Sequence, residues 1–375
     1  MRFGAGTPDI EVKRYYWTET NTAVDSNTLT IDAVTVANAF CRPIGMGAPF
    51  YGAVPVTDSE NVQNYQVIPL VTGTTTVTLN FYHGTRNVSM EGWIEVWEYV
   101  GAASGANEFV VLHHGEVAMS ATTSEDVTLD TTGTTQADMV PIWGGITATS
   151  FGTTEQFRGD RLRKHLAITS TSNCNVSRHD GTSATELGLT VVEFTGSNWT
   201  VNENDVTHPA STLGASTHTI TSVTDWTNTM FFHTHQGRDG GVGSDDHSLL
   251  GYVGNSSATQ FKTNHQVNGP NPVEGTLYTV HNSDLSVEHN DTVDGDASTT
   301  VPRPTTTITE PGDHDLTTAV SAEAVSTNVG TINASLSWIA WLSDSTTFAT
   351  DYVTTDGDED LDYSFQIIDL DGVAS

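Results

Sequence analysis

One pattern of β-strand sequence occurs four times in the chain, at intervals of roughly 90 to 98 residues. Each copy opens on an alternating strand and closes on an apolar pair followed by a polar residue. Tandem copies favour a structural or binding protein over an enzyme. Repeated sequence specifies a repeated shape, whereas catalysis requires a single pocket whose residues differ from those of the other copies. The opening strands are Leu29-Thr30-Ile31, Val127-Thr128-Leu129, His218-Thr219-Ile220 and Asp315-Leu316-Thr317. The closing segments are Val96-Trp97-Glu98-Tyr99, Val191-Val192-Glu193-Phe194, Thr279-Val280-His281-Asn282 and Ile367-Ile368-Asp369-Leu370.

The alternation in the opening strands predicts which side chains are buried. Successive residues of a strand point to opposite faces of the sheet, so a slip of one residue would turn the apolar face outward. We expect Ile31, Leu129 and Ile220 to be buried, and Thr30 and Thr128 to face the solvent.

Composition points to an all-β fold. Hydrophobic residues make up 36% of the 375 residues, which is below the usual share for a globular protein. Threonine, serine, glycine and aspartate are abundant in their place. Threonine favours strands and the other three favour turns, while no long amphipathic helical pattern is present. We expect tandem β-sandwich or jelly-roll-like modules of about 90 residues, with little helix.

Turn residues and prolines in the sequence predict where one module ends and the next begins. Pro302, Pro304 and Pro311 lie among threonines and predict an extended spacer, so that the fourth module would sit apart from the others. The N-terminal segment is aromatic, which favours an edge strand on the first module or a clamp on a neighbouring subunit. The expected segments are an N-terminal arm (1–20), three modules (21–125, 126–214 and 215–293), a Pro/Thr linker (294–313) and a fourth module (314–375).

The charge limits the environment and the partners. The net charge is −33, from 46 acidic and 13 basic residues, and only three of the basic residues are lysines. Such self-repulsion destabilises a compact fold in dilute buffer and is screened in concentrated salt. An acidic, lysine-poor surface is typical of proteins from extreme halophiles; the alternative is an acidic mesophilic virion or secreted protein. Nucleic-acid binding is not expected, because it requires basic stripes.

Neither a secretory leader nor a membrane-inserted segment is expected. The first twenty residues have no apolar core of the kind that signal peptides carry, and no apolar stretch approaches the length of a membrane span. Cys41 and Cys174 occupy different places in their repeats and are expected to be buried as small apolar residues.

Two segments contain residues that could bind a divalent cation. The first is a histidine- and aspartate-rich stretch, in which two histidines at i and i+2 share one strand face before a glycine-rich loop. The second has alternating carboxylates but fails the EF-hand pattern, so an acidic hairpin is the alternative there. The metal candidates are His233, His235, Asp239, Asp245, Asp246 and His247 in the first segment and Asp356, Asp358 and Asp360 in the second. Solvated loops or subunit contacts are the alternative for the first segment, and no other cofactor is expected.

No catalytic residues are predicted. The common hydrolase, metalloprotease and nucleotide-binding motifs do not occur in the sequence. Glu98 and Glu193 recur at equivalent repeat positions, which favours a structural role for both. His113 and His114 are adjacent in an expected strand, so one of them must point outward and is expected at the surface. The chain is therefore not expected to be an enzyme.

One stretch resembles a known class of protein. Residues 167–178 followed by Leu-Thr-Val-Val-Glu-Phe at 189–194 resemble the strand–hairpin–strand units of structural proteins in tailed phages. Together with the acidic surface, this resemblance implies a virion protein of a tailed virus of haloarchaea, in the tail, baseplate or fibre or in a capsid decoration. It implies as partners further copies of the chain, other virion proteins, and a glycan or protein of the host surface. An exported adhesin or surface-layer component is the second hypothesis.

Overall fold

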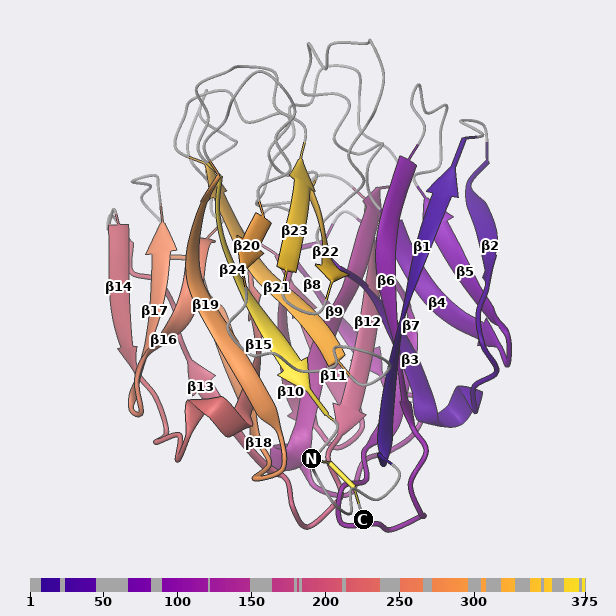
Figure 1. Ribbon diagram of the computed structural model, residues 1–375, viewed down its shortest axis with the longest axis horizontal. Coiled ribbons are helices and arrows are strands. Elements are labelled where there is room, and N and C mark those ends of the chain that lie inside the picture. Colours follow the sequence, from indigo (N-terminus) through magenta and orange to yellow (C-terminus); the bar gives the residue numbers. More distant parts are fainter. Residues whose placement is uncertain are drawn as a thin grey trace.

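The chain folds into four consecutive modules that share one six-stranded plan, as the computed structural model in Figure 1 shows. In each module the first, sixth and third strands form an antiparallel sheet, which we call the inner sheet. The second, fifth and fourth strands form the outer sheet. The structure describes residues 8–20, 24–44, 67–81, 90–120, 122–148, 164–178, 181, 184–210, 214–236, 250–265, 272–295, 305–307, 318–327, 338–344, 347–352, 361–370 and 373–374. The expected all-β fold of tandem modules is confirmed.

The strands follow one another in the same order in all four modules. Module 1 has β1 (Ile10–Glu19), β2 (Ser26–Thr30), β3 (Ala39–Ile44), β4 (Val67–Gly73), β5 (Thr76–Phe81) and β6 (Met90–Tyr99). Module 2 has β7 (Val110–Met119), β8 (Ser124–Thr128), β9 (Met139–Ala148), β10 (His165–Ser170), β11 (Asn173–Ser177) and β12 (Thr185–Glu193). Module 3 has β13 (Thr200–Asp205), β14 (Gly214–Thr219), β15 (Thr229–His235), β16 (Leu250–Ser257), β17 (Gln260–His265) and β18 (Gly275–His281). Module 4 has β19 (Ser286–Gly295), β20 (Thr305–Thr307), β21 (Thr318–Thr327), β22 (Trp338–Asp344), β23 (Thr347–Tyr352) and β24 (Leu361–Asp369).

Short 3-10 helices lead into the third strand of the first three modules. They are η1 (Val36–Asn38), η3 (Gln136–Asp138) and η4 (Trp226–Asn228). Within the described residues, no helix is long and apolar enough to span a membrane.

The burial pattern explains why the two sheets use different sequences. In the outer sheets, β5 and β11 alternate between buried and half-buried residues, because one face packs on the module core and the other meets solvent. In the inner sheets, β12 is buried at every position but one and β18 at all but its last. A strand covered on both faces needs apolar residues on both, which is why the closing segments read as apolar pairs.

The predicted register is confirmed. Ile31, Leu129 and Ile220 are buried, and Thr30 and Thr128 are exposed. Each buried residue follows its strand directly. Its backbone N–H donates to the second residue of the two-residue hairpin between the fourth and fifth strands, with carbonyl acceptors at Thr75, Ser172 and Thr259.

The four modules form a closed ring. The fourth strand of each module packs on the inner sheet of the next: β4 on β9 and β12, β10 on β15 and β18, and β16 on β21 and β24. The fourth strand of module 4, β22, packs on β3 and β6 of module 1 and closes the ring. The two ends of the described chain also meet, through a bridge between Pro8 and Ala374 and a 2.9 Å bond from the Asp9 N–H to the Val373 carbonyl (Figure 1).

All four inner sheets contribute to one central hydrophobic cluster, while the first three modules also have an apolar core of their own. Module 1 supplies Phe40 and Trp97 to the central cluster, and module 4 supplies Ile368 and Leu370. Module 4 is therefore packed with the rest and does not sit apart, contrary to expectation.

A set of hydrogen-bonded polar side chains, centred on Asn107, connects the modules. The Asn107 amide donates to Asp9 Oδ2 at 3.0 Å, and Asn107 Oδ1 accepts from the amides of Asn198 (2.9 Å) and Asn282 (3.1 Å). Asp9, Asn107 and Asn282 are almost fully buried. These residues lie beside the links between successive modules, so the hydrogen bonds fix the links relative to one another.

Strand pairing sets the module boundaries earlier in the chain than expected. The described part of the expected arm, residues 1–20, is β1, which pairs with β6 from Ile10↔Tyr99 to Glu19↔Met90. The edge-strand interpretation of this segment therefore agrees with the structure. β7 lies within the range expected for the first module, yet it pairs with β12 of module 2. β13 was expected in the second module and pairs with β18 of module 3.

The expected linker, residues 294–313, contributes to module 4. β19 extends into it and pairs with β24, and β20 within it pairs with β23. Thr307 pairs with Thr347 as Thr30 pairs with Thr76, so Thr305–Thr307 is the counterpart of the opening strands. The expected opening strand at 315–317 lies outside the described residues. An extended Thr/Pro sequence suits an edge strand such as β20 as well as it suits a spacer.

Candidate functional site

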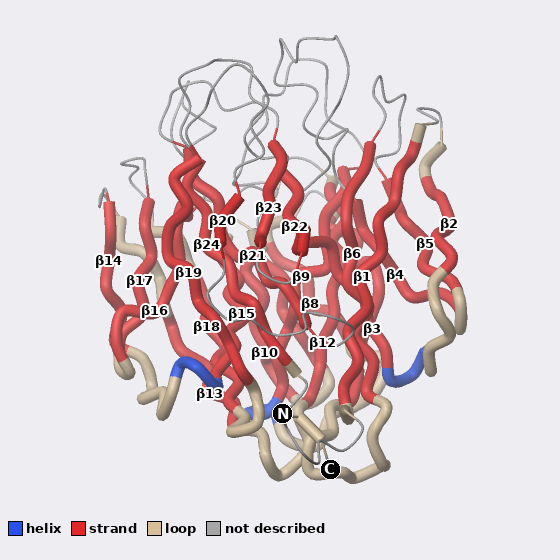
Figure 2. Tube along the Cα trace, viewed as in Figure 1, coloured by secondary structure: helices blue, strands red, loops and turns tan. Residues whose placement is uncertain are grey.

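The two ends of the ring differ in the connections that they carry (Figures 1 and 2). The first, third and fifth strands of every module run toward one end, which we call the loop-bearing end. The connections between third and fourth strands leave from it, at residues 45–66, 149–164, 236–249 and 328–337, and those of modules 1 to 3 are the longest connections in the sequence. The opposite end, the closed end, has the two-residue hairpins, the 3-10 helices and the links between modules. Loops displayed on a rigid frame are where binding residues are concentrated in β proteins.

An aromatic pair lies on module 1 toward the loop-bearing end, with Tyr16 exposed and Trp93 half-buried. Tyr16 on β1 is 45% exposed, and its ring lies 5.4 Å from that of Trp93 on β6, with 55° between the ring planes. Tyr16 is one of the few large hydrophobic residues exposed in the described part of the chain. Exposed aromatic rings can bind an apolar face of a ligand and still present a polar edge.

His233 and His235 lie on one strand face, as expected from their spacing. Their rings stack 5.1 Å apart with 25° between their planes, on β15. Both are buried, and they face the interior of module 3, where the His233 ring lies 6.3 Å from Phe261 of the outer sheet. The backbone of Gly275 on β18 comes so close that an added Cβ would lie 3.1 Å from His233 Nε2. The pair thus lies between the two sheets of the module.

A second pair of histidines lies in module 3. His208 Nδ1 and His218 Nε2 both contact the Thr263 hydroxyl, at 2.9 and 2.7 Å. Burial lowers the pKa of His218, and the nearby Asp205 carboxylate opposes this. Module 3 therefore contains two pairs of buried or half-buried histidines.

The remaining metal candidates are not placed by the structure. Asp239, Asp245, Asp246 and His247 lie outside the described residues, as do Asp356, Asp358 and Asp360. Within the described ranges, no group of three or more His, Cys, Asp or Glu side chains is arranged to hold a metal ion.

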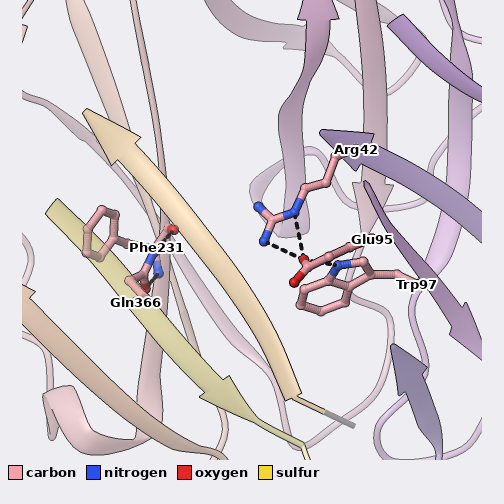
Figure 3. A network of polar contacts seen from close by, with 5 residues as sticks. All are labelled: Arg42, Glu95, Trp97, Phe231 and Gln366. Carbon is pink, nitrogen blue, oxygen red and sulfur yellow. Dashed lines mark hydrogen bonds and ion pairs between the residues drawn. The ribbon is translucent and has the colours of Figure 1, made fainter. Parts of the chain in front are cut away.

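A buried ion pair lies where module 1 faces the centre of the ring (Figure 3). Arg42 on β3 donates to Glu95 Oε2 on β6 from Nε at 3.3 Å and from Nη2 at 3.2 Å, and the Trp97 indole donates to the same oxygen at 3.1 Å. The guanidinium lies over the Trp97 ring and over Phe232 of module 3, at 5.4 and 5.7 Å. Removal of either partner would leave an uncompensated charge buried among these rings.

Side chains from one module satisfy the open strand edges of another. The Gln366 amide of β24 accepts from the Phe231 N–H at 2.8 Å and donates to the Phe231 carbonyl at 2.7 Å, on β15 (Figure 3). The Thr234 hydroxyl on β15 contacts the N–H and the carbonyl of Leu166 on β10 at 3.3 and 3.2 Å. In both cases a side chain supplies the hydrogen bonds that a neighbouring strand would otherwise make to the backbone of a buried edge strand.

Glu98 and Glu193 have structural partners, as their repetition predicts. Glu98 accepts the Thr35 N–H at 2.6 Å before η1. Glu193 accepts the N–H groups of Thr134 and Thr135, at 2.9 and 2.6 Å, before η3. The two carboxylates anchor equivalent connections at the closed end.

Cys41 and Cys174 are buried in the apolar cores of modules 1 and 2, as expected. Burial raises the pKa of both thiols, to about 12 for Cys174. Neither is a reactive thiolate at neutral pH.

His114 is the residue whose role the sequence did not predict. One of His113 and His114 was expected at the surface, but both are half-buried, and the His114 ring lies between modules 1 and 2 and accepts a hydrogen bond from Val71. The single available signal was a histidine pair in a strand, which does not identify the neighbour that the strand packs on.

Comparison with known proteins adds no assignment: no family model matches the chain, and a search of curated proteins finds no similar sequence.

Proposed function

We propose that the chain is a non-enzymatic structural component of the exterior of a tailed virus particle. It would stand in the tail, baseplate or fibre, or decorate the capsid, and would assemble with copies of itself and with other virion proteins. The observation that carries the proposal is the closed ring of four like modules, in which the connections between third and fourth strands all leave from one end.

The distribution of buried polar groups supports a role based on shape. Arg42–Glu95, Gln366–Phe231 and the Asn107 group all join strands or modules to one another. Their chemistry is used to fix the ring, and Glu98 and Glu193 are used in the same way at the closed end. A protein built on such contacts suits a rigid support for displayed loops.

The loop-bearing end is proposed to face outward and to contact a glycan or protein of the host surface. The exposed Tyr16 ring, packed on the half-buried Trp93, would contribute an aromatic contact beside those loops. The net charge of −33 favours a saline habitat, because screening by salt removes the self-repulsion that opposes a compact ring.

The test is mass spectrometry and labelling of purified particles. The chain should be present at a copy number comparable to that of known structural proteins in the same sample. Antibodies against residues 45–66 should label intact particles, and antibodies against the hairpin at residues 70–76 of the closed end serve as the matched comparison. Absence of the chain, or presence at trace copy number, would contradict the proposal.

The second candidate is an exported adhesin or surface-layer component of a halophile. The same ring and the same acidic surface suit it. A longer precursor with a cleaved leader, found by mass spectrometry of the cell envelope, would favour this candidate over the virus particle.

A further inference from the structure

The interface between modules 1 and 2 contains a hydrogen bond that depends on the protonation state of one imidazole. His114 on β7 of module 2 accepts the backbone N–H of Val71, on the edge strand β4 of module 1, at 3.1 Å through Nε2. Its other ring nitrogen, Nδ1, lies 2.8 Å from the Thr190 hydroxyl on β12. The ring therefore joins the open edge of one module to the inner sheet of the next.

The direction of these bonds fixes the tautomer of the ring. A backbone N–H can only donate, so His114 Nε2 must be unprotonated and Nδ1 must carry the proton. Protonation of Nε2 would place its N–H against the N–H of Val71. The Val71 amide would then lose its imidazole acceptor and keep only the weak acceptor of the adjacent Cys41 thiol, and the two N–H donors would repel each other.

The surroundings of His114 contain little that would stabilise an imidazolium. The titratable groups described around the contact are His113 and Glu116 on β7 and Cys41 on β3, whose Sγ lies 3.6 Å from Nε2. Val71 and Thr190 are uncharged. Burial, with a smaller contribution from His113, lowers the pKa of His114 from 6.5 to about 4.

We infer that the interface between modules 1 and 2 is an acid-sensitive joint, in which protonation of His114 breaks its bond to Val71 and releases β4 from the inner sheet of module 2. The folded-state pKa lies below that of a free imidazole, so the joint is stable above pH 6.5 and weakens as the pH falls toward 4. With these two values, the ratio of open to closed joint rises about 25-fold between pH 7.5 and pH 5.

The next interface has a histidine that does not have this sensitivity. His165 Nε2 on β10 contacts the Thr276 hydroxyl of module 3 at 2.7 Å. A hydroxyl can donate or accept, so this contact survives protonation of the ring. Burial lowers the pKa of His165, and Glu274 and Asp205 oppose this. Acid should therefore act first at the joint between modules 1 and 2.

The test is the pH dependence of amide hydrogen exchange in β4, corrected for the intrinsic exchange rate. Protection of β4 should fall about 25-fold from pH 7.5 to pH 5 in the unmodified chain. His114→Gln keeps an acceptor that does not titrate, so β4 protection should become independent of pH. His113→Gln is the matched control: it removes only the smaller contribution of His113 to the His114 pKa, so the fall in β4 protection should persist in that variant.

NMR of the unmodified chain provides a test that does not depend on a variant folding. With labelled histidine and valine, the His114 ring and the Val71 amide should titrate together with a midpoint near pH 4. A Val71 amide that does not respond to pH, or a β4 response that persists in a folded His114→Gln variant, would overturn the inference.

Discussion

At the scale of single residues, hydrogen-bond capacity and backbone space decide which positions tolerate change. Glu193 is 2% exposed and accepts from two backbone amides and from the Thr134 hydroxyl, whereas among the described residues Glu98 accepts from the Thr35 amide. Gly145 on β9 has a φ of +103°, and a Cβ there would lie 2.1 Å from the Val67 carbonyl oxygen of module 1. The glutamates are constrained by the hydrogen bonds that they accept, and Gly145 is constrained by the space around its backbone.

The two repeated glutamates should differ in their contribution to stability. Glu193→Ala removes the acceptor of two backbone amides and should lower the free energy of unfolding by about 2–4 kcal/mol. Glu98→Ala removes one such acceptor and should cost about 1–2 kcal/mol. Urea unfolding of both variants measures the difference. Equal effects would show that the additional bonds of Glu193 contribute nothing.

Gly145→Ala should be strongly destabilising. The new methyl group would meet the Val67 carbonyl in a backbone conformation that side chains rarely adopt, which together should cost about 3 kcal/mol or more. Gly73→Ala is the control, because the nearest atoms to its added Cβ lie at 3.5 Å. Thermal denaturation should separate the two variants by several degrees, and similar midpoints would contradict the close approach of β9 to β4.

At the scale of elements, the modules are joined by side chains that occupy open strand edges. β4, β10 and β15 are edge strands of three-stranded sheets, and each has a backbone group bonded to a side chain of a neighbouring module. An edge strand with unpaired backbone groups is a site for unwanted pairing, so these side chains both complete the fold and protect it. This geometry also explains why the polar Gln366 lies within the otherwise apolar closing strand β24.

Substitution of Gln366 should test this role. Gln366→Leu keeps the approximate volume but leaves the N–H and the carbonyl of Phe231 without partners, at a cost of about 2–4 kcal/mol. Thr234→Val, which removes longer bonds to Leu166, should cost about 1–2 kcal/mol. Both variants should also show faster amide exchange at the strand that loses its partner. Wild-type stability for Gln366→Leu would contradict a packed interface between modules 3 and 4.

At the scale of the whole molecule, the ring replaces the linear stack that tandem repeats more often form. β22 packs on β3 and β6, and the Asp9 N–H bonds to the Val373 carbonyl, so the first and last modules are neighbours. Side chains from all four modules form one continuous central cluster. Loss of one module would therefore expose apolar surface on the other three.

Circular permutation should be tolerated where deletion is not. A chain whose natural ends are joined by a flexible linker, and which is opened at the exposed link between Ala103 and Ser104, retains every module contact. It should unfold in one transition within a few degrees of the original chain. Deletion of module 4 (286–375) should lower the transition strongly or abolish it, because the ring and its central cluster are opened. A deletion variant as stable as the full chain would show that the modules are independent.

The sequence by itself determined the features that depend on neighbouring residues. The alternation at Thr30-Ile31 and Thr128-Leu129 specified both faces of the opening strands, and the spacing of His233 and His235 placed them on one side of β15. Tertiary structure decided that this side faces the interior of module 3. It also decided that residues 10–19 form a strand of module 1, that β20 forms within the expected linker, and that His114 contacts Val71. Each of these depends on a partner far away along the chain, and the period of a strand specifies its faces without specifying which strand will lie at its edge.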